Sequence, residues 1–473
     1  MSTSTSTTTS TNTAFLIQYV IKSLTPDSVP EAVWLRIEDL FLDWLGSTLS
    51  SRGTHPIPIF ETTAKYMGPK DGTAQVFASG STSSPYWAAW TNAASSHTLE
   101  QDDVHNGSVM HPATVVFPAV LAAAQDNHKT GPEMLLASIA GYEVGVRIAE
   151  SMGRSHYQTF HTTSTMGTIA AAVAVGKLLN LDYEQMLSAL GTAGAQASGI
   201  WAFMRSGAGD TKQLHSAHAA ANGLLSAYMA RDGLKGAPDI IEGPGGLMKS
   251  LARDDVDATR LTDGLGERWA VLETSFKYHA CCRHTHPAAD ALLDAIEKHG
   301  IKDPMTGIKG VVAHVHQVAL DVLGPVDAAP PPKTVHTAKF SMKSTLALIA
   351  LRRSAGLVDF KELALTDPSV LEFRDRVSMV LDPVVDEAYP KQWLGRVQVE
   401  LNDGRVVGGA CDEPKGDPGN TLSRPELEDK FRRLVSYPGT SPACETEKII
   451  AWCWALREGS RAGQSCAVPG ITS

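Results

Sequence analysis

Acidic and imidazole side chains gather in one short stretch, residues 97–117 (HTLEQDDVHNGSVMHPATVVF). Three carboxylates and three histidines fall within its first fifteen positions: Glu100, Asp102, Asp103, His97, His105 and His111. The segments on either side, AAWTNAASS and VVFPAVLAAA, carry no charge, although charged residues make up 19% of the chain. Carboxylates beside imidazoles in apolar surroundings are suited to proton transfer near neutral pH. Taken alone, the stretch is equally compatible with a functional site and with a solvated loop that carries a helix cap.

Three further stretches carry side chains that bind anions or move protons. His161 stands in FHTTS, just before an Ala-rich helix, where polar groups at a helix N-terminus can hold an anion. Lys212 and His215 lie one helical turn apart in DTKQLHSAH and therefore share a face. The run KYHACCRHTH holds the last group, Lys277, Cys282, His284 and His286. For the adjacent cysteines, inert buried thiols are the simpler interpretation.

The sequence patterns of common cofactor sites are absent. Asp102, Asp103, His105 and His111 are of metal-ligand type, but no HExxH or paired CxxC spacing accompanies them, so we predict no metal. No GxGxxG after a strand, GxxxxGK[ST] or GxSxG occurs, so we predict no nucleotide cofactor and no serine nucleophile elbow. Lysines, histidines and carboxylates remain. They suit binding a small polycarboxylate and moving a proton on the carbon next to a carboxylate.

Helical patterns dominate the segments that must position these residues. Residues 14–48 show two such patterns, the second closed by Gly46, and residues 85–98 lead into the acidic stretch as another helix. Residues 113–230 form segments of helical spacing rich in Ala and Gly, which lets helices approach closely. We predict a compact, largely buried helical bundle here.

The pattern changes after Trp269. The run GIKGVVAHVHQVALDV (307–322) alternates as a strand does, and GRVQVELNDGRVVGGAC (395–411) predicts a hairpin around Asn-Asp-Gly. Helical pieces lie between, and the C-terminal tail is helical again. The predicted fold is mainly α with a smaller α+β domain. We expect a helical domain of residues 14–270 and 411–473, an α+β domain of residues 271–410, and a disordered Ser/Thr tail of residues 1–13.

Composition limits the classes of partner and the compartment. A net charge of −10 argues against binding nucleic acid or a polybasic association with membranes. The six cysteines form no disulfide framework, so free thiols in a reducing compartment are expected. No uncharged apolar run has the length of a membrane span, and the N-terminus resembles neither a secretory signal nor a transit peptide. We expect a cytoplasmic protein.

The chain resembles the MmgE/PrpD family. The resemblance rests on EQDDVH followed by His111-Pro112, then GYEVGVRI, the helix containing Lys212, FKYHACCRHTHPAADAL and AKFSMKS, in this order over nearly the whole chain. The family includes 2-methylcitrate dehydratases, cis-aconitate decarboxylases and iminodisuccinate epimerases. Its members are homodimers with a large helical domain and a smaller α+β lid, so the resemblance implies a homodimer with its site between the two domains.

The resemblance is strongest to the fungal cis-aconitate decarboxylase-like branch, through the Ala-Cys-Cys run and the spacing from Asp102 to His111. The Asn-Asp-Thr-Trp and Glu-Trp-Gly-His-Pro runs of dedicated methylcitrate dehydratases are absent. Cys282 falls where some animal decarboxylases have a histidine. The implied catalytic residues are Glu100, His111, His161, Lys212 and Lys277. The implied substrate-binding residues are Asp102, Asp103, His105, His215, Cys282 and His286.

These observations predict a cofactor-free lyase acting on a small di- or tricarboxylate. The residues serve equally for dehydration of a 2-methylcitrate-like acid and for decarboxylation of a cis-aconitate-like acid. An epimerase of an iminodisuccinate-like dicarboxylate, with His161 and Lys212 on opposite faces of one carbon, is the alternative within enzymes. A catalytically silent binding protein on the same fold is the alternative outside them.

Overall fold

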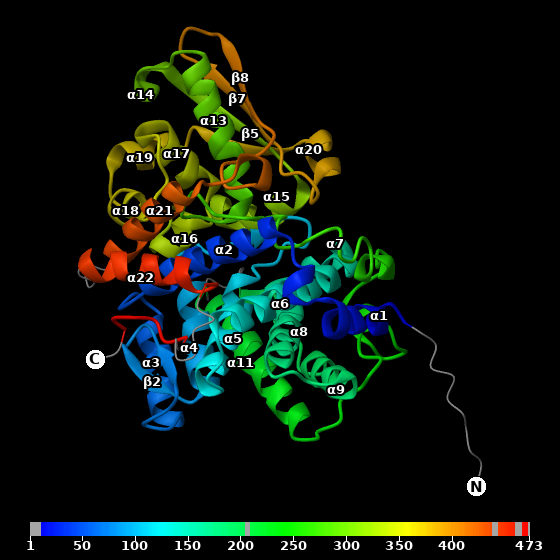
Figure 1. The fold of residues 1–473 in the computed structure, drawn as a ribbon. Coiled ribbons are helices and arrows are strands. Elements are labelled where there is room, and N and C mark those ends of the chain that lie inside the picture. Colours follow the sequence, from blue (N-terminus) through cyan, green and yellow to red (C-terminus); the bar gives the residue numbers. More distant parts are fainter. Residues whose placement is uncertain (1–10, 204–208, 438–442, 459–465, 472–473) are drawn as a thin grey trace.

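The computed structural model describes residues 11–203, 209–437, 443–458 and 466–471. A large helical part lies against a smaller part that contains a four-stranded sheet (Figure 1). The predicted fold class, mainly α with a smaller α+β part, is confirmed. Across these described ranges, no helix has the length and apolar character needed to cross a membrane.

Helix α8 lies at the centre of the helical part and packs against α5, α6, α9 and α11. Small residues allow this close packing, as predicted. A Cβ on Gly145 of α6 would lie 2.5 Å from that of Ala170, and one on Gly223 of α11 would lie 2.5 Å from that of Ala171. The helices of this part are α1 (Asn12–Gln18), α2 (Glu31–Ser50), α3 (Ile57–Met67), α4 (Pro85–Ser96), α5 (Ala113–Asp126), α6 (Gly131–Ser151), α7 (Gly153–Tyr157), α8 (Thr162–Leu178), α9 (Tyr183–Gly194), α11 (Thr211–Arg231) and α12 (Leu247–Leu251).

The sheet of the smaller part has the order β6-β5-β7-β8. Strands β5 (Ile308–Val315) and β6 (Val377–Leu381) pair in parallel, and β7 (Gly395–Leu401) and β8 (Val406–Cys411) form the predicted antiparallel hairpin. The strand predicted over 307–322 is too long, because His316 accepts a hydrogen bond from the backbone of Ala319 and begins α15 (Gln317–Ala328). The other main helices here are α13 (His286–Lys298), α16 (Val335–Lys339), α17 (Met342–Arg352) and α19 (Pro368–Arg374).

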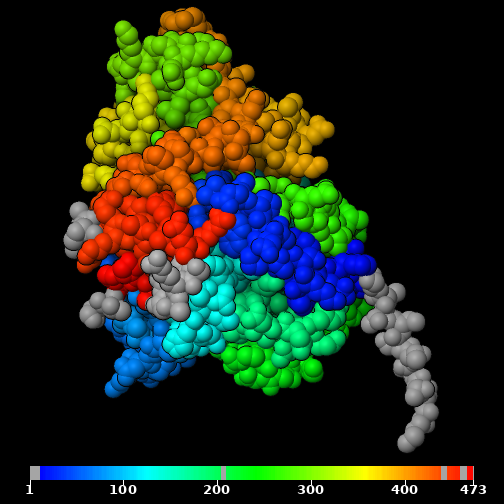
Figure 2. All heavy atoms as spheres, in the orientation of Figure 1, coloured from blue at the N-terminus to red at the C-terminus, as the bar shows by residue number. Residues whose placement is uncertain are grey.

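The C-terminal helices return to the helical part. Helix α21 (Arg424–Ser436) packs along α2, and Arg424 binds Glu38 at 2.6 Å and Asp39 at 2.9 Å. Figure 2 shows this C-terminal segment on the surface beside the N-terminal helices. Gly46 does not close a helix as predicted; it lies inside α2, where a Cβ would come within 2.9 Å of the Phe431 ring. The close approach of α21 explains this glycine.

Two large clusters of buried apolar side chains fill the molecule. One joins the N-terminal helices to residues of α21, α22 (Ala443–Ala455) and the last described segment, and the other lies mainly between residues 280 and 401. The domain boundaries at 271 and 410 remain predictions.

The predicted disordered tail, residues 1–13, lies outside the described residues as far as Ser10. Residues 11–13 of the predicted tail are ordered, which contradicts the prediction for this part. Thr11 caps α1, and the backbone N–H of Thr13 donates to Glu242 at 2.7 Å, so these residues are held in the first helix.

Candidate active site

Four structural elements bring the chemistry-bearing side chains together. The acidic loop (residues 98–103) follows α4 and leads into the short strand β3 (Val104–His105), which pairs with β4 (Thr274–Ser275). This pairing sets Lys277, two residues beyond β4, beside the acidic loop. His161 is the residue before α8, and Lys212 lies in the first turn of α11.

Two lysines bind the carboxylate of Glu100. The Lys277 Nζ lies 2.7 Å from one carboxylate oxygen, and the Lys212 Nζ contacts the other. All three side chains are buried. Burial alone would raise the pKa of Glu100, but the two ammonium groups outweigh it and hold that pKa well below its usual range. The group is therefore a buried anion between two cations.

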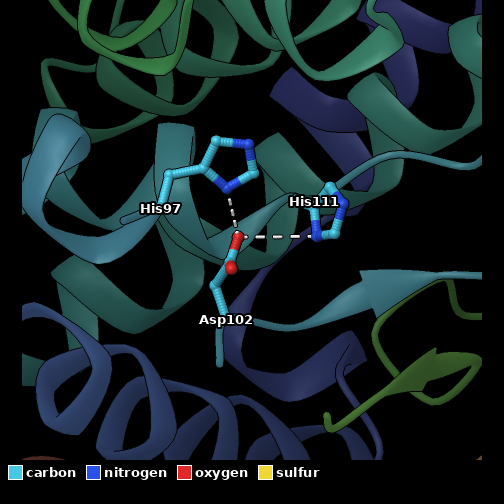
Figure 3. Close-up of side chains that lie close together, drawn as sticks. All are labelled: His97, Asp102 and His111. Carbon is cyan, nitrogen blue, oxygen red and sulfur yellow. Dashed lines mark hydrogen bonds and ion pairs between the residues drawn. The ribbon is translucent and has the colours of Figure 1, made fainter. Parts of the chain in front are cut away.

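Asp102 is hydrogen-bonded to one imidazole, that of His97, and lies within ion-pair distance of a second, that of His111. Its Oδ2 lies 2.7 Å from His97 Nδ1 and 3.4 Å from His111 Nδ1, and both contacts are visible in Figure 3. Its other oxygen, Oδ1, lies 3.7 Å from the Lys277 Nζ. Burial raises the pKa of Asp102, but His97, Lys277 and His111 together lower it below the ordinary value. Asp102 is thus an ionised acceptor that fixes the orientation of both rings.

The position of the proton on His111 follows from its partners. The His111 Nδ1 lies 2.6 Å from the carbonyl oxygen of Asp103, which can only accept, so Nδ1 carries the hydrogen. The Nε2 atom then has a free lone pair in the neutral ring and becomes a donor only in the imidazolium. Burial and the nearby Lys277 charge hold the pKa of His111 well below its usual range. The resting ring is therefore a base.

His161 and His215 form a second imidazole pair. Their Nδ1 atoms lie 3.3 Å apart, so one ring donates and the other accepts. The His161 ring also stacks on His97, with ring centres 5.6 Å apart and planes at 14°. Burial, followed by the charge of a neighbouring histidine, lowers the pKa of both members, that of His215 to about 4; no carboxylate among the described residues pairs with either ring to favour its charged form.

The remaining predicted residues divide into supporting and distant groups. Asp103 accepts from Tyr142 Oη at 2.7 Å and from the backbone of Ala113 at 3.0 Å, so it anchors the loop to α5 and α6. Burial raises the pKa of the Asp103 carboxyl well above its usual range. Burial, followed by the Glu100 charge, likewise raises the pKa of the Cys282 thiol to about 11, which makes it a thiol rather than a nucleophilic thiolate.

His105 and His286 face away from the cluster. His105 lies 3.2 Å from Glu273 and 3.0 Å from Ser108, and the His286 Nε2 lies 3.3 Å from the carbonyl of Cys281. Neither ring contacts Glu100 or Asp102 among the described interactions. Their predicted substrate-binding roles stay predictions.

Two residues at the site were not among the predicted site residues, although His97 stood in the acidic and histidine-rich stretch and was expected to be structural. His97 binds Asp102 directly, and its buried Nε2 has no hydrogen-bond partner in the described structure. Lys339 is buried, and its Nζ donates to the carbonyl of Leu99 at 2.8 Å. The run AKFSMKS contains Lys339 and was the available signal for it.

The three side chains in Figure 3 are close enough to hold a metal ion, with ligand atoms within 4.8 Å of one another. The surroundings do not suit one. Lys277 already lies 3.7 Å from Asp102, and its charge would repel a divalent cation. The Asp102 oxygen that faces the two rings already accepts a hydrogen from His97, and the Nδ1 hydrogen of His111 is bound to the Asp103 carbonyl. The arrangement is suited to acid–base chemistry on an anion.

The fold and the site together define a helical protein with a buried acid–base site that holds two lysines for an anionic ligand. Residues 16–259 match the model of the MmgE/PrpD N-terminal domain, and residues 279–456 match that of the MmgE/PrpD C-terminal domain. The chain belongs to the MmgE/PrpD family, and it is a lyase.

Several known proteins are similar over most of their length. A cis-aconitate decarboxylase-like protein of Aspergillus oryzae is 28% identical over 441 residues, which cover 88% of this chain and 89% of that protein. The cis-aconitate decarboxylase of Aspergillus terreus is 28% identical over 456 residues, 90% of each chain. The human cis-aconitate decarboxylase is 26% identical over 364 residues, which cover 74% of this chain and 73% of the human protein.

Proposed function

We propose that the protein decarboxylates a cis-aconitate-like tricarboxylate and then protonates the carbon next to a remaining carboxylate. The proposal rests on one observation: Lys212 and Lys277 both form buried ion pairs with Glu100, beside the Asp102–His111 pair. The names of the similar proteins from Aspergillus and human support decarboxylation as the reaction.

The two lysines are the proposed binding groups for substrate carboxylates. The chain carries a net charge of −10, so attraction for a polyanion must come from local cations. In the absence of substrate, the single carboxylate of Glu100 pairs with both ammonium groups and offsets only one of their two positive charges. A substrate carboxylate would contact these ammonium groups and form charge-assisted hydrogen bonds in a dry environment.

The chemical step requires stabilisation of an electron pair. When the bond between the CH₂ carbon and its carboxylate carbon breaks, CO₂ leaves and the electron pair stays on the substrate. It shifts through the neighbouring carbon–carbon double bond to the carbon that bears another carboxylate, into which it is delocalised. Lys212 and Lys277 would stabilise that charge. His111, as the imidazolium, would transfer its Nε2 proton to the carbanion carbon, and solvent would restore that proton. One proton is consumed for each CO₂ released.

The bound substrate would itself prepare His111 for this role. Burial and Lys277 keep the resting ring neutral, but a polyanion beside it favours the imidazolium and raises its pKa. Asp102 keeps the ring oriented while it gains and loses the proton. We assign His161 to a second proton-transfer position, with His215 as its orienting partner.

Substrate entry would involve movement of the two parts of the molecule. The residues of the cluster are at most 9% exposed, and Leu99, Gln213 and Lys339 at the edge of the site are among the residues that line a cavity of about 680 Å³. We propose that the α+β part acts as a lid, and that closure excludes water from the carbanion.

Proton NMR in D₂O with cis-aconitate and 2-methylcitrate separates this function from its alternatives. Decarboxylation releases CO₂ from cis-aconitate, whereas a dehydratase would remove the hydroxyl of 2-methylcitrate. An epimerase would show solvent exchange on a chiral dicarboxylate without either loss. Binding without turnover or exchange would indicate a silent binding protein and would overturn the proposal.

We further propose that the protein is a cytoplasmic homodimer. The five described cysteines that carry free thiols support a reducing compartment. Helix α3 exposes Ile59, Tyr66 and Met67 to solvent, and such a face is available for a second copy. Light scattering coupled to size-exclusion chromatography should give twice the 50.4 kDa chain mass, and the chain mass itself would contradict the dimer.

A further inference from the structure

We propose that Lys339 and Lys430 are positioning residues for Glu100. They hold the backbone on both sides of Glu100 and thereby keep its carboxylate between Lys212 and Lys277. The inference rests on the proposed function, in which these charges bind the substrate.

Glu100 has a backbone conformation that needs external support. Its φ is 56°, in the left-handed region that residues with a Cβ seldom adopt. Such a residue persists where surrounding contacts fix it, and these residues are concentrated at functional sites. The direction of the Glu100 carboxylate depends on this φ, because rotation to the ordinary region would turn the side chain away from the two lysines.

Three consecutive carbonyl groups around Glu100 are each held by a buried side chain. The Lys339 Nζ donates to the Leu99 carbonyl at 2.8 Å, and the Lys430 Nζ donates to that of Gln101 at 2.9 Å. Between them, the Gln101 amide donates to the Glu100 carbonyl at 3.2 Å and to that of His279 at 3.0 Å. The whole turn is therefore fixed by side chains rather than by a helix or sheet.

The two lysines come from separate parts of the chain. Lys339 is the last residue of α16, in the α+β part, and Lys430 lies in α21 and is paired with Asp43 of α2 at 2.6 Å. Figure 1 shows α16 and α21 along the boundary between the two parts. Burial lowers the pKa of Lys339 to about 7, and its amine donates to the carbonyl in either protonation state. The support for Glu100 thus depends on contact between both parts of the molecule.

Loss of either lysine is expected to act on substrate binding. Without its donor, the turn can relax toward an ordinary φ, and Glu100 then releases Lys212 and Lys277 from their binding positions. The Michaelis constant should therefore rise. A merely structural loss would lower the fraction of active enzyme and hence the apparent kcat, but it would leave KM unchanged.

The test uses Lys339→Met and Lys430→Met, with Lys177→Met as the matched control. Lys177 also donates to two backbone carbonyls, those of Val20 at 2.7 Å and Leu24 at 2.8 Å, but it lies in the last turn of α8, at the opposite end of that helix from His161. We expect KM for cis-aconitate to rise and kcat/KM to fall by about tenfold or more in the first two variants, as for loss of one charged hydrogen bond. The control should keep the wild-type KM.

A double-mutant cycle with Glu100→Gln shows whether the lysines act through Glu100. If they do, Lys339→Met costs much less in kcat/KM when Glu100 is already replaced. Additive losses, or an unchanged KM in both lysine variants, would overturn the positioning role. Absence of turnover by the wild-type protein would instead contradict the proposed function. The cycle is then measured on the binding constant for citrate, and additive losses of binding free energy in the double variant would refute the positioning role in the same way.

Discussion

Replacement of Glu100 by glutamine is the sharpest perturbation of the buried charge cluster. The substitution keeps the shape of the side chain but removes the anion that Lys212 and Lys277 share. Removal of one partner from a buried ion pair typically costs about 3–5 kcal/mol, because an uncompensated charge remains. Asp102 still lies 3.7 Å from the Lys277 Nζ, so we expect a loss of about 3 kcal/mol, near the lower limit.

The assay is urea unfolding at pH 7, followed by tryptophan fluorescence, with Glu31→Gln as the control. Glu31 also binds a cation through both carboxylate oxygens, each of which accepts a hydrogen bond from the Arg457 guanidinium at 2.6 Å. This pair lies on the surface, where ion pairs contribute little to stability. The control should unfold at the wild-type midpoint and Glu100→Gln at a clearly lower one. Citrate should restore stability to Glu100→Gln more than it stabilises the wild type, because it supplies the missing negative charge.

The pH dependence of the stability difference is an independent test of the same prediction. The pKa of Glu100 is depressed in the folded protein, so its contribution is complete above the unfolded value of about 4.3 and is lost as pH falls further. The difference in stability between wild type and Glu100→Gln should thus be full at pH 7 and shrink below about pH 4. Equal midpoints at pH 7 would refute the assignment of Glu100 as the anion shared by both lysines.

The remaining predictions concern the imidazoles and the binding lysine. His111→Ala should lower kcat by about 10²-fold with KM nearly unchanged. Lys212→Met should raise KM and also lower kcat, because Lys212 both binds the substrate and stabilises the carbanion. Steady-state kinetics on cis-aconitate checks both, and a wild-type kcat for His111→Ala or a wild-type KM for Lys212→Met would contradict the assigned roles. Burial, with the His97 charge second, lowers the pKa of His215 from 6.5 to about 4, so its neutral form stabilises the fold above pH 6.5 and this stability is lost as pH falls toward 4. The lowered pKa of His215 corresponds to a loss of about 3 kcal/mol in the free energy of unfolding between pH 6.5 and 4. In His215→Asn, the free energy of unfolding should therefore fall by about 3 kcal/mol less over this interval than in the wild type. The same pH dependence in both proteins would show that His215 is not buried as described.

The helical bundle and the β7–β8 hairpin were predictable because their signals are local. Alanine and glycine at helical spacing, and Asn-Asp-Gly between two alternating runs, each specify one structure. One boundary error has a local cause, because His316 begins a helix inside an alternating run. The other has a distant cause, because Gly46 makes room for Phe431, which lies far along the chain. No window of sequence contains both members of that second contact.

The residue types at the site were predictable, but their partners were not. The sequence indicated Glu100, His111 and Lys277, yet only the pairing of β3 with β4 shows that Lys277 binds Glu100. The left-handed backbone conformation of Glu100 could not be predicted either, because a glutamate in the sequence does not indicate a positive φ. Its support comes from Lys339 and Lys430, which the fold brings to the loop from other elements.

Release of CO₂ from cis-aconitate by the purified protein in D₂O tests the central claim most directly. We predict one CO₂ for each substrate consumed, and a product that carries one deuterium on the carbon next to a carboxylate, because the His111 proton exchanges with solvent. Folded protein that binds cis-aconitate but releases no CO₂ would contradict the assignment of this buried lysine–histidine site to decarboxylation.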